Sequence, residues 1–138
     1  MCGIAGSTTA TSDVLQTMGA RLRHRGPDSD GTWQAPGGIL GLAHTRLKVI
    51  DLSDGGHQPM VSDDRRFALV FNGEIYNYKA LRRDLESKGE SFRSDSDTEV
   101  LFVLLRREGK KALARLVGMF SFAFWNGESG ELLLARDR

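Results

Sequence analysis

Two helical patterns follow one another with no strand pattern between them, and this order restricts the fold more than any other feature. Residues 77–88 place three apolar side chains at helical spacing and stop at Gly89. A second helix is predicted from the capping-box sequence Ser96-Asp97-Thr98-Glu99 to Gly109. Strand patterns lie before and after the pair. This order argues against alternating βαβ units and predicts an α+β fold, with helices packed outside antiparallel sheet.

The remaining elements are short apolar runs bounded by turn residues. A helix capped by Ser12 or Asp13 is predicted to end before Gly26-Pro27. The run at 67–71 is predicted to end at Asn72-Gly73, a common turn pair. Strands are also predicted over 2–7, 31–35, 39–47, 119–125 and 131–135, with a short helical stretch at 112–116 and a hairpin turn at 126–130.

The apolar run 132–135 comes just before the last residue, Arg138, with no later segment to pair with it or cover it. A bare apolar edge strand favours aggregation. We therefore expect the domain to be truncated at its C-terminus.

Charge and cysteine content limit the classes of function. The chain of 138 residues holds 19 basic and 18 acidic side chains, so no strong field indicates nucleic acid or an anionic membrane as a partner. One cysteine excludes an internal disulfide and metal sites built on several thiolates. No apolar run is long enough for a membrane span, and no signal-peptide pattern is present. A cytoplasmic location is the default expectation.

Cys2 directly follows the initiator methionine. If Met1 were removed, one residue would carry both a thiol and a free α-amine. A cysteine thiol ordinarily has a pKa of about 8.5 and an α-amine one of about 7.7–8.0, so proton transfer between the two groups costs only roughly 1 kcal/mol. Position alone favours an accidental, buried cysteine. The functional alternative is a nucleophile that carries its own base.

Asn72-Gly73 also has two interpretations. Taken alone, the pair is a turn signal. The functional alternative is an oxyanion hole that combines the side-chain amide of Asn72 with the backbone N–H of Gly73.

Three charged residues could hold an amino-acid ligand. Arg46 ends an apolar strand, where its guanidinium could bind a carboxylate through two parallel hydrogen bonds. Glu74 and Asp97 could together bind an ammonium group. Asp97 is equally well explained as a residue favoured at a helix N-terminus, and Glu74 as a surface charge. The sequence leaves open whether these residues converge.

The histidines favour structural roles. His24, His44 and His57 lack the local sequence of papain-type proteases, and no His-x-x-x-His spacing or second cysteine supports a zinc site. The loop His24-Arg25-Gly26-Pro27-Asp28 is too polar for a core and suggests a supporting role beside a site. No glycine-rich phosphate loop is present.

Five motifs occur in one order and together are far more specific than any one alone. They resemble the glutaminase domain of class II glutamine amidotransferases, specifically that of glutamine-hydrolysing asparagine synthetases, over nearly the whole chain. The motifs are Met1-Cys2-Gly3-Ile4-Ala5-Gly6, His24-Arg25-Gly26-Pro27-Asp28, Arg46-Leu47-Lys48-Val49-Ile50-Asp51, Asn72-Gly73-Glu74-Ile75-Tyr76-Asn77 and Ser96-Asp97-Thr98-Glu99.

The resemblance implies an N-terminal-nucleophile (Ntn) hydrolase, a four-layer αββα sandwich in which Cys2 becomes the first residue. Glutamine would be converted to glutamate and ammonia through a γ-glutamyl thioester. By the resemblance, Cys2 is the nucleophile and proton shuttle, Asn72 and Gly73 form the oxyanion hole, Arg46 binds the substrate carboxylate, the backbone of Val49 and Ile50 lines the pocket, and Glu74 and Asp97 surround the substrate α-amine.

The resemblance also implies the partners. Residues 1–138 would be an incomplete glutaminase domain that takes L-glutamine and supplies ammonia to a synthetase domain absent from this sequence. No metal or cofactor is expected in this chain, and ATP and Mg²⁺ are expected only in the synthetase domain. A homodimer is left open. Two alternatives remain: a class II amidotransferase with a sugar-phosphate or phosphoribosyl acceptor, and a non-catalytic glutamine-binding fragment.

Overall fold

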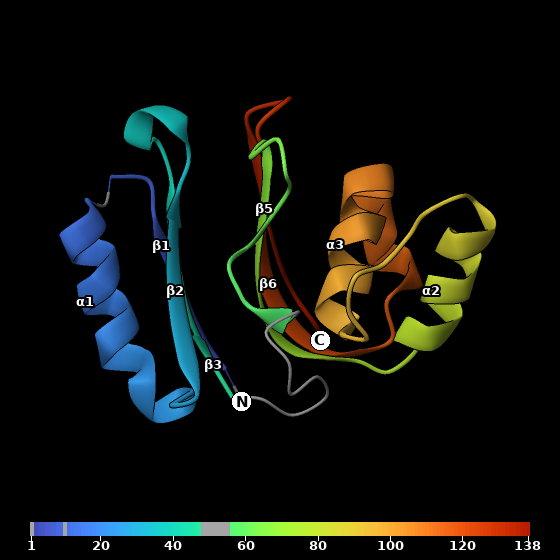
Figure 1. Cartoon of the computed structure of the whole chain (residues 1–138), viewed down its shortest axis with the longest axis horizontal. Coiled ribbons are helices and arrows are strands. Elements are labelled where there is room, and N and C mark those ends of the chain that lie inside the picture. The colour runs from blue at the N-terminus through green and yellow to red at the C-terminus, as the bar shows by residue number, and fades with distance from the viewer. Residues whose placement is uncertain (1, 10, 48–55) are drawn as a thin grey trace.

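The computed structural model describes residues 2–9, 11–47 and 56–138 as two antiparallel sheets packed face to face, with helices on both outer faces (Figure 1). The predicted α+β sandwich with layers in the order αββα is confirmed. The first sheet has the strand order β1-β3-β2, built from β1 (Gly3–Ser7), β2 (Ser29–Gln34) and β3 (Gly41–Arg46). The second has the order β4-β5-β6-β7, built from β4 (Met60–Val61), β5 (Phe67–Ile75), β6 (Gly118–Asn126) and β7 (Glu131–Arg136).

Helix α1 (Ser12–Leu22) covers the first sheet, while α2 (Tyr78–Ser87) and α3 (Asp97–Glu108) cover the second (Figure 1). Short 3₁₀ turns follow α1 (Arg23–Arg25) and α3 (Gly109–Arg115), and a third joins β2 to β3 (Pro36–Gly38). Within the described residues, no helix is long and apolar enough to cross a membrane.

Strand β5 is buried on both faces, which explains its uninterrupted apolar run. Alternate side chains of a strand point to opposite faces. Ala68 and Val70 therefore pack against the first sheet, in a cluster that includes Leu42. Phe67, Leu69 and Phe71 pack against α2 and α3 on the other side. Each large apolar side chain that is fully buried in this way contributes about 1.5–3 kcal/mol to folding.

The inner faces of the two sheets change from apolar to polar toward one end of the sandwich. On β3 the inward series runs Leu42, His44, Arg46, and all three are buried. On β5 it runs from Val70 to Asn72, followed by Glu74. The polar ends of the two series lie at the same end of the sandwich, where side chains of both line one cavity.

The prediction that β5 ends at Asn72-Gly73 is wrong. The strand continues to Ile75, and Gly73 pairs with Phe120 of β6. A Cβ on Gly73 would lie 2.1 Å from the backbone oxygen of Met119, and the φ angle of this glycine is 153°. The glycine therefore permits a close approach between strands rather than a turn.

The capping prediction for α3 is confirmed at Ser96 and differs at Glu99. The backbone N–H of Glu99 donates to Ser96 Oγ over 3.1 Å. The Glu99 carboxylate accepts from the backbone N–H groups of Arg93 and Ser94 instead of from Ser96. This cap places Asp97 at the first helical position, pointing back toward β5.

Candidate active site

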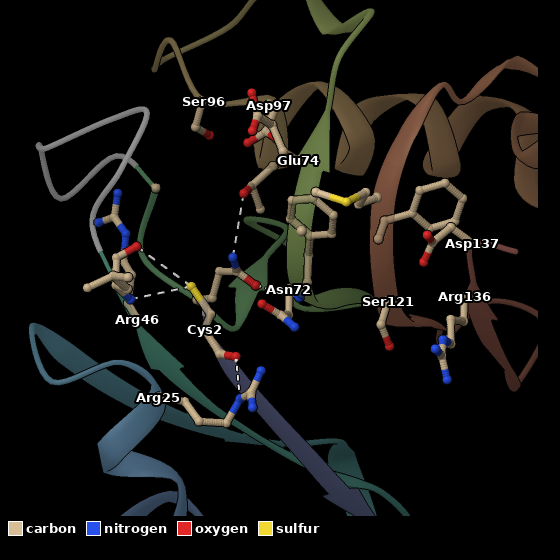
Figure 2. Close-up of a pocket in the computed structure, with 18 residues that line it drawn as sticks. Cys2, Arg25, Arg46, Asn72, Glu74, Ser96, Asp97, Ser121, Arg136 and Asp137 are labelled. Carbon is tan, nitrogen blue, oxygen red and sulfur yellow. Dashed lines mark hydrogen bonds between the residues drawn. The ribbon is translucent and has the colours of Figure 1, made fainter.

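A cavity of about 650 Å³ opens at the polar end of the sandwich (Figure 2). Its walls come from the residue before β1, the end of β3, the second half of β5, the N-terminus of α3, the first half of β6 and the end of β7. Six residues predicted from the sequence line it together: Cys2, Arg46, Asn72, Gly73, Glu74 and Asp97. Val49 and Ile50, predicted to line the same pocket, lie outside the described residues.

The Cys2 thiol is held at the rim of the cavity by the end of β3. Because β1 pairs with β3 from Gly3 and Thr45 onward, Cys2 lies beside the segment that follows Arg46. The Leu47 N–H donates to Cys2 Sγ over 3.4 Å, and the thiol donates to the Leu47 carbonyl over 3.7 Å. Cys2 is half-buried and lines the cavity, and its thiol is positioned by Leu47.

Arg25 is a cavity residue that sequence reasoning placed only in a supporting loop. Its Nε–H donates to the backbone oxygen of Cys2 over 3.1 Å (Figure 2). The loop is pressed against β3, because a Cβ on Gly26 would lie 2.5 Å from the Thr45 oxygen. The Gly-Pro pair among polar residues was the sequence signal for this loop. The contact itself joins Arg25 to Cys2, which lie 23 positions apart along the chain.

Asn72 and Gly73 lie on β5 opposite Cys2. The side chain of Asn72 belongs to the inward series, and its Oδ1 is buried without a hydrogen-bond partner among the described residues. Buried polar atoms without partners are uncommon in cores and are often found at functional sites. The N–H groups of Phe71, Gly73 and Ile75 point to the same edge of β5, because alternate N–H groups of a strand point the same way. The Phe71 N–H bonds to Gln58 and the Ile75 N–H to Asp97.

The Asp97 carboxylate is buried beside β5. The Ile75 N–H donates to its Oδ2 over 2.9 Å. Burial raises the pKa of Asp97 above its ordinary value, the nearby negative charge of Glu74 raises it further, and backbone N–H donors from Ile75 and Thr98 oppose the rise. Glu74 is exposed and faces the same cavity. The two carboxylates therefore gather negative charge at one side of the pocket.

Arg46 supplies positive charge at the wall formed by β3 and the segment around Gly56. Its side chain is only 6% exposed. A Cβ on Gly56 would lie 2.4 Å from the Arg46 Nη2, so the glycine makes room for the guanidinium. The cavity thus contains a thiol, amide donors, a guanidinium and carboxylates, which is the set of groups that an amino-acid amide requires.

The hydrogen bonds of His24 and His44 join backbone carbonyl groups and not the Cys2 thiol. His24 Nδ1 is 3.1 Å from the Arg21 carbonyl, and His44 Nε2 is 3.2 Å from the Phe71 carbonyl. Burial lowers the pKa of His44 to about 4, with the hydrogen bond to the Phe71 carbonyl opposing and the charges of His57 and Arg46 assisting.

Gln58, which sequence reasoning missed, also lines the cavity. In the part of the chain described, no group of three His, Cys, Asp or Glu residues could hold a metal ion.

Comparison with known proteins agrees with this geometry. The family model for the glutamine amidotransferase domain matches residues 1–138. Asparagine synthetase [glutamine-hydrolyzing] 1 of Bacillus subtilis is 41% identical, over 99% of this chain and 22% of the relative. Asparagine synthetase B [glutamine-hydrolyzing] of Escherichia coli is 35% identical, over 99% of this chain and 25% of the relative.

A solved structure gives the same fold. Glutamine phosphoribosylpyrophosphate amidotransferase from B. subtilis, complexed with ADP and GMP, superposes with a TM-score of 0.77 at 25% sequence identity, over 99% of this chain and 36% of that one. The chain spans 22% and 25% of the length of the two synthetases above. The family that the five sequence motifs resemble is confirmed by these matches, and the chain belongs to the glutamine amidotransferase domain family.

Proposed function

We propose that this domain hydrolyses the side-chain amide of L-glutamine to glutamate and ammonia, with Cys2 as the nucleophile. The observation that carries the proposal is the convergence of Cys2, Asn72, Arg46 and Asp97 on one cavity of about 650 Å³. Arg46 and Asn72 come from different strands, Asp97 from a helix and Cys2 from the position before β1. Their meeting is therefore a property of the fold and not of local sequence.

The charged walls match the backbone end of an amino acid. The Arg46 guanidinium suits the α-carboxylate, because its planar fork pairs with two carboxylate oxygens. Asp97 and Glu74 suit the α-ammonium group. A substrate held at both charged groups would direct its side chain toward the remaining wall, where Cys2 and Asn72 lie. This arrangement supports an amino acid with a side-chain amide as the substrate class.

The chemistry follows from the groups present. The Cys2 thiolate attacks the amide carbon, and the new C–S bond leaves a tetrahedral oxyanion. The Asn72 amide and the Gly73 N–H would donate to that oxyanion, and such a donor is typically worth about 3 kcal/mol in the transition state. The thiol proton passes to the α-amine of Cys2, which is free once Met1 is removed, and then to the departing nitrogen. Ammonia leaves, and water hydrolyses the thioester to glutamate.

We also propose an acceptor for the ammonia outside residues 1–138. The higher identity to glutamine-hydrolysing asparagine synthetases than to the phosphoribosylpyrophosphate amidotransferase supports a synthetase domain as the partner. ATP and Mg²⁺ would serve that domain, and the glutaminase half-reaction written above requires neither. A phosphoribosyl or sugar-phosphate acceptor is the second candidate. The sequence encoded downstream of Arg138 decides between them.

The direct test compares the wild-type chain with Cys2→Ala and Cys2→Ser. Both variants should reduce glutamate release by at least about a thousandfold, because the other catalytic groups act only after the Cys2 sulfur has attacked the amide. Intact mass should show loss of Met1 and, with a glutamine-like diazo ketone, one adduct on the sole cysteine.

Three results would contradict the proposal: retained Met1 in an active preparation, full turnover in Cys2→Ala, or glutamine binding by calorimetry with no ammonia released. The last result would support the non-catalytic glutamine-binding alternative.

A further inference from the structure

Along the edge of β5 that borders the cavity, side chains hold the backbone at positions where no strand among the described residues pairs with it. Strand β4 pairs only with Ala68 and Leu69 of β5. Beyond that point the Phe71 N–H donates to Gln58 Oε1 over 2.6 Å, and the Ile75 N–H donates to Asp97 Oδ2 over 2.9 Å. Gly73 lies between these two fixed positions. A side chain that holds Phe71 therefore also sets the position of the next two residues.

The carbonyl group of Phe71 is held from the opposite sheet. His44 Nε2 lies 3.2 Å from the Phe71 oxygen, and because a carbonyl oxygen only accepts, the histidine nitrogen must be the donor. His44 is fully buried on β3, where it pairs with Ile4 of β1. Ile4 is two residues from Cys2. His44 therefore links the sheet that carries the thiol to the peptide group shared by Phe71 and Asn72.

Gln58 provides a second link, from β5 to the N-terminus of α3. Its side chain is 4% exposed. The Gln58 Oε1 accepts from the Phe71 N–H, and the Gln58 Nε2 donates to Thr98 Oγ1 over 3.5 Å. Thr98 is next to Asp97 in the chain. The hydrogen bond between Gln58 and Phe71 is much shorter than the contact between Gln58 and Thr98. It therefore contributes more to holding the Phe71 backbone in place. The weaker contact orients the amide so that its oxygen faces Phe71.

We propose that His44 and Gln58 are positioning residues that hold the peptide groups of Phe71 and so fix Asn72 and Gly73 relative to Cys2. The inference rests on the proposed function, because it assigns these two side chains to the geometry of the oxyanion hole. Neither is a catalytic residue, since each acts through the backbone of β5. The Phe71 side chain belongs to the core cluster with α2 and α3, and the bonds from His44 and Gln58 act on its backbone.

The same strand offers a matched control. Ser62 Oγ accepts from the Phe67 N–H over 3.0 Å, which is the same kind of bond on β5 and lies four residues before the one to Gln58. Ser62 is buried and is not among the residues that line the cavity. If side-chain bonds to β5 serve only stability, removing Ser62 Oγ and removing the Gln58 amide should have the same consequences.

The experiment measures glutamine hydrolysis by Gln58→Met, His44→Leu, His44→Gln and Ser62→Ala in the full chain. Displacements near 1 Å at a reacting centre cost about a hundredfold in rate. Gln58→Met and His44→Leu should therefore lower kcat by about 10- to 100-fold, with KM changed less than about threefold. His44→Gln, which retains an N–H near the position of Nε2, should recover most of the loss. Ser62→Ala should keep the wild-type kcat.

Two further readouts separate positioning from general loosening. Alkylation of Cys2 by iodoacetamide needs no oxyanion hole, so its rate should stay within about threefold of wild type. Backbone amide exchange at Asn72, which pairs with Ser121 of β6, should accelerate at least about tenfold in Gln58→Met and His44→Leu, and remain unchanged in Ser62→Ala.

Retention of kcat in folded Gln58→Met and His44→Leu would overturn the inference, and so would an equal loss of kcat in Ser62→Ala. If the wild-type chain released no glutamate, the proposed function would fail by itself. Amide exchange would still decide the inference in that case: unchanged exchange at Asn72 would overturn it, and accelerated exchange would support it.

Discussion

Asp97 combines burial, backbone donors and a neighbouring carboxylate at a single side chain. Burial raises its pKa, and the hydrogen bond donated by the Ile75 N–H works in the opposite direction. A raised pKa means that the folded chain binds the proton more tightly than the unfolded chain does. The contribution of Asp97 to stability is therefore greatest in acid and is lost as the pH rises through its folded pKa. A carboxylate that stays buried despite the free-energy cost of removing its charge from water is typical of a ligand-binding position.

Asp97→Asn should lower kcat/KM for glutamine by about 10- to 100-fold, mainly through KM, because a charge-assisted contact to the substrate ammonium is worth roughly 1.5–3 kcal/mol. The wild-type profile of kcat/KM should fall in acid at a pH above the ordinary aspartate value of 3.8, since protonation removes the negative charge. The measurement is the pH profile of kcat/KM for both proteins. A profile in Asp97→Asn that keeps the same acid limb would rule out this assignment.

Strand β5 carries both the core and the site, and its register against β6 joins them. Its first half is buried on both faces, and its second half presents Asn72 and Glu74 to the cavity. Gly73 of β5 and Gly118 of β6 lie where the two strands approach each other closely. A Cβ on either glycine would lie 2.1 Å from a backbone oxygen of the facing strand. A shift of this register would therefore move the core and the oxyanion donors together.

Gly73→Ala should destabilise the chain by about 2 kcal/mol or more and reduce kcat, because the new methyl group collides with backbone and the φ of 153° is unfavourable for alanine. Urea unfolding and glutamate release measure the two effects. Gly37→Ala is the matched control: its φ is also positive, at 76°, but no atom lies within 4 Å of the added Cβ. Equal losses of stability in both variants would show that backbone strain, and not the strand crossing, is responsible.

Local patterns predicted most of the elements but not all of their ends. Apolar spacing suffices for α1, α3 and the β6–β7 hairpin, because these depend on neighbours in sequence. The predicted cap at Ser12 or Asp13 is wrong: Thr11 is the N-cap residue of α1, and its side chain makes no capping hydrogen bond. Asn72-Gly73 was misread because an Asn-Gly pair is compatible with both a turn and a close strand crossing. The strand at Met60–Val61 is too short to carry any periodicity.

The site was predictable as a set of residue types and not as a geometry. The resemblance to a family supplied Cys2, Asn72, Arg46 and Asp97 together, although the residues alone left their convergence open. Gln58 and the His44 contact to Phe71 were missed because each joins segments from different layers, and no local pattern records which side chain will meet a backbone group 13 or 27 positions away.

At the scale of the whole molecule, the edge made by β7 is the most exposed apolar feature of the described residues. Leu134 is 68% exposed, and in the described part of the chain β7 pairs only with β6. Beside it lies an apolar cavity of about 710 Å³, lined by residues of β1, β3, β5, β6 and β7. An unpaired apolar edge of this kind favours association with another chain.

Leu134→Lys should reduce concentration-dependent association of the chain while changing Tm by less than about 3 °C, because a charge on an exposed edge position opposes pairing at little cost in folding. Sedimentation velocity over a range of concentrations provides the measurement. Val14→Lys, at an exposed apolar position on α1, is the control and should leave association unchanged. If both variants associate as the wild type does, the contact lies elsewhere.

The thiol and the oxyanion donors belong to opposite halves of the sandwich, and Asp97 is reached only 95 residues after Cys2 in the order of synthesis. A ribosome therefore releases the sulfur long before the residues proposed to bind the substrate and to stabilise the oxyanion have been made. Until both halves have closed on each other, an emerging chain has a nucleophile without a substrate pocket.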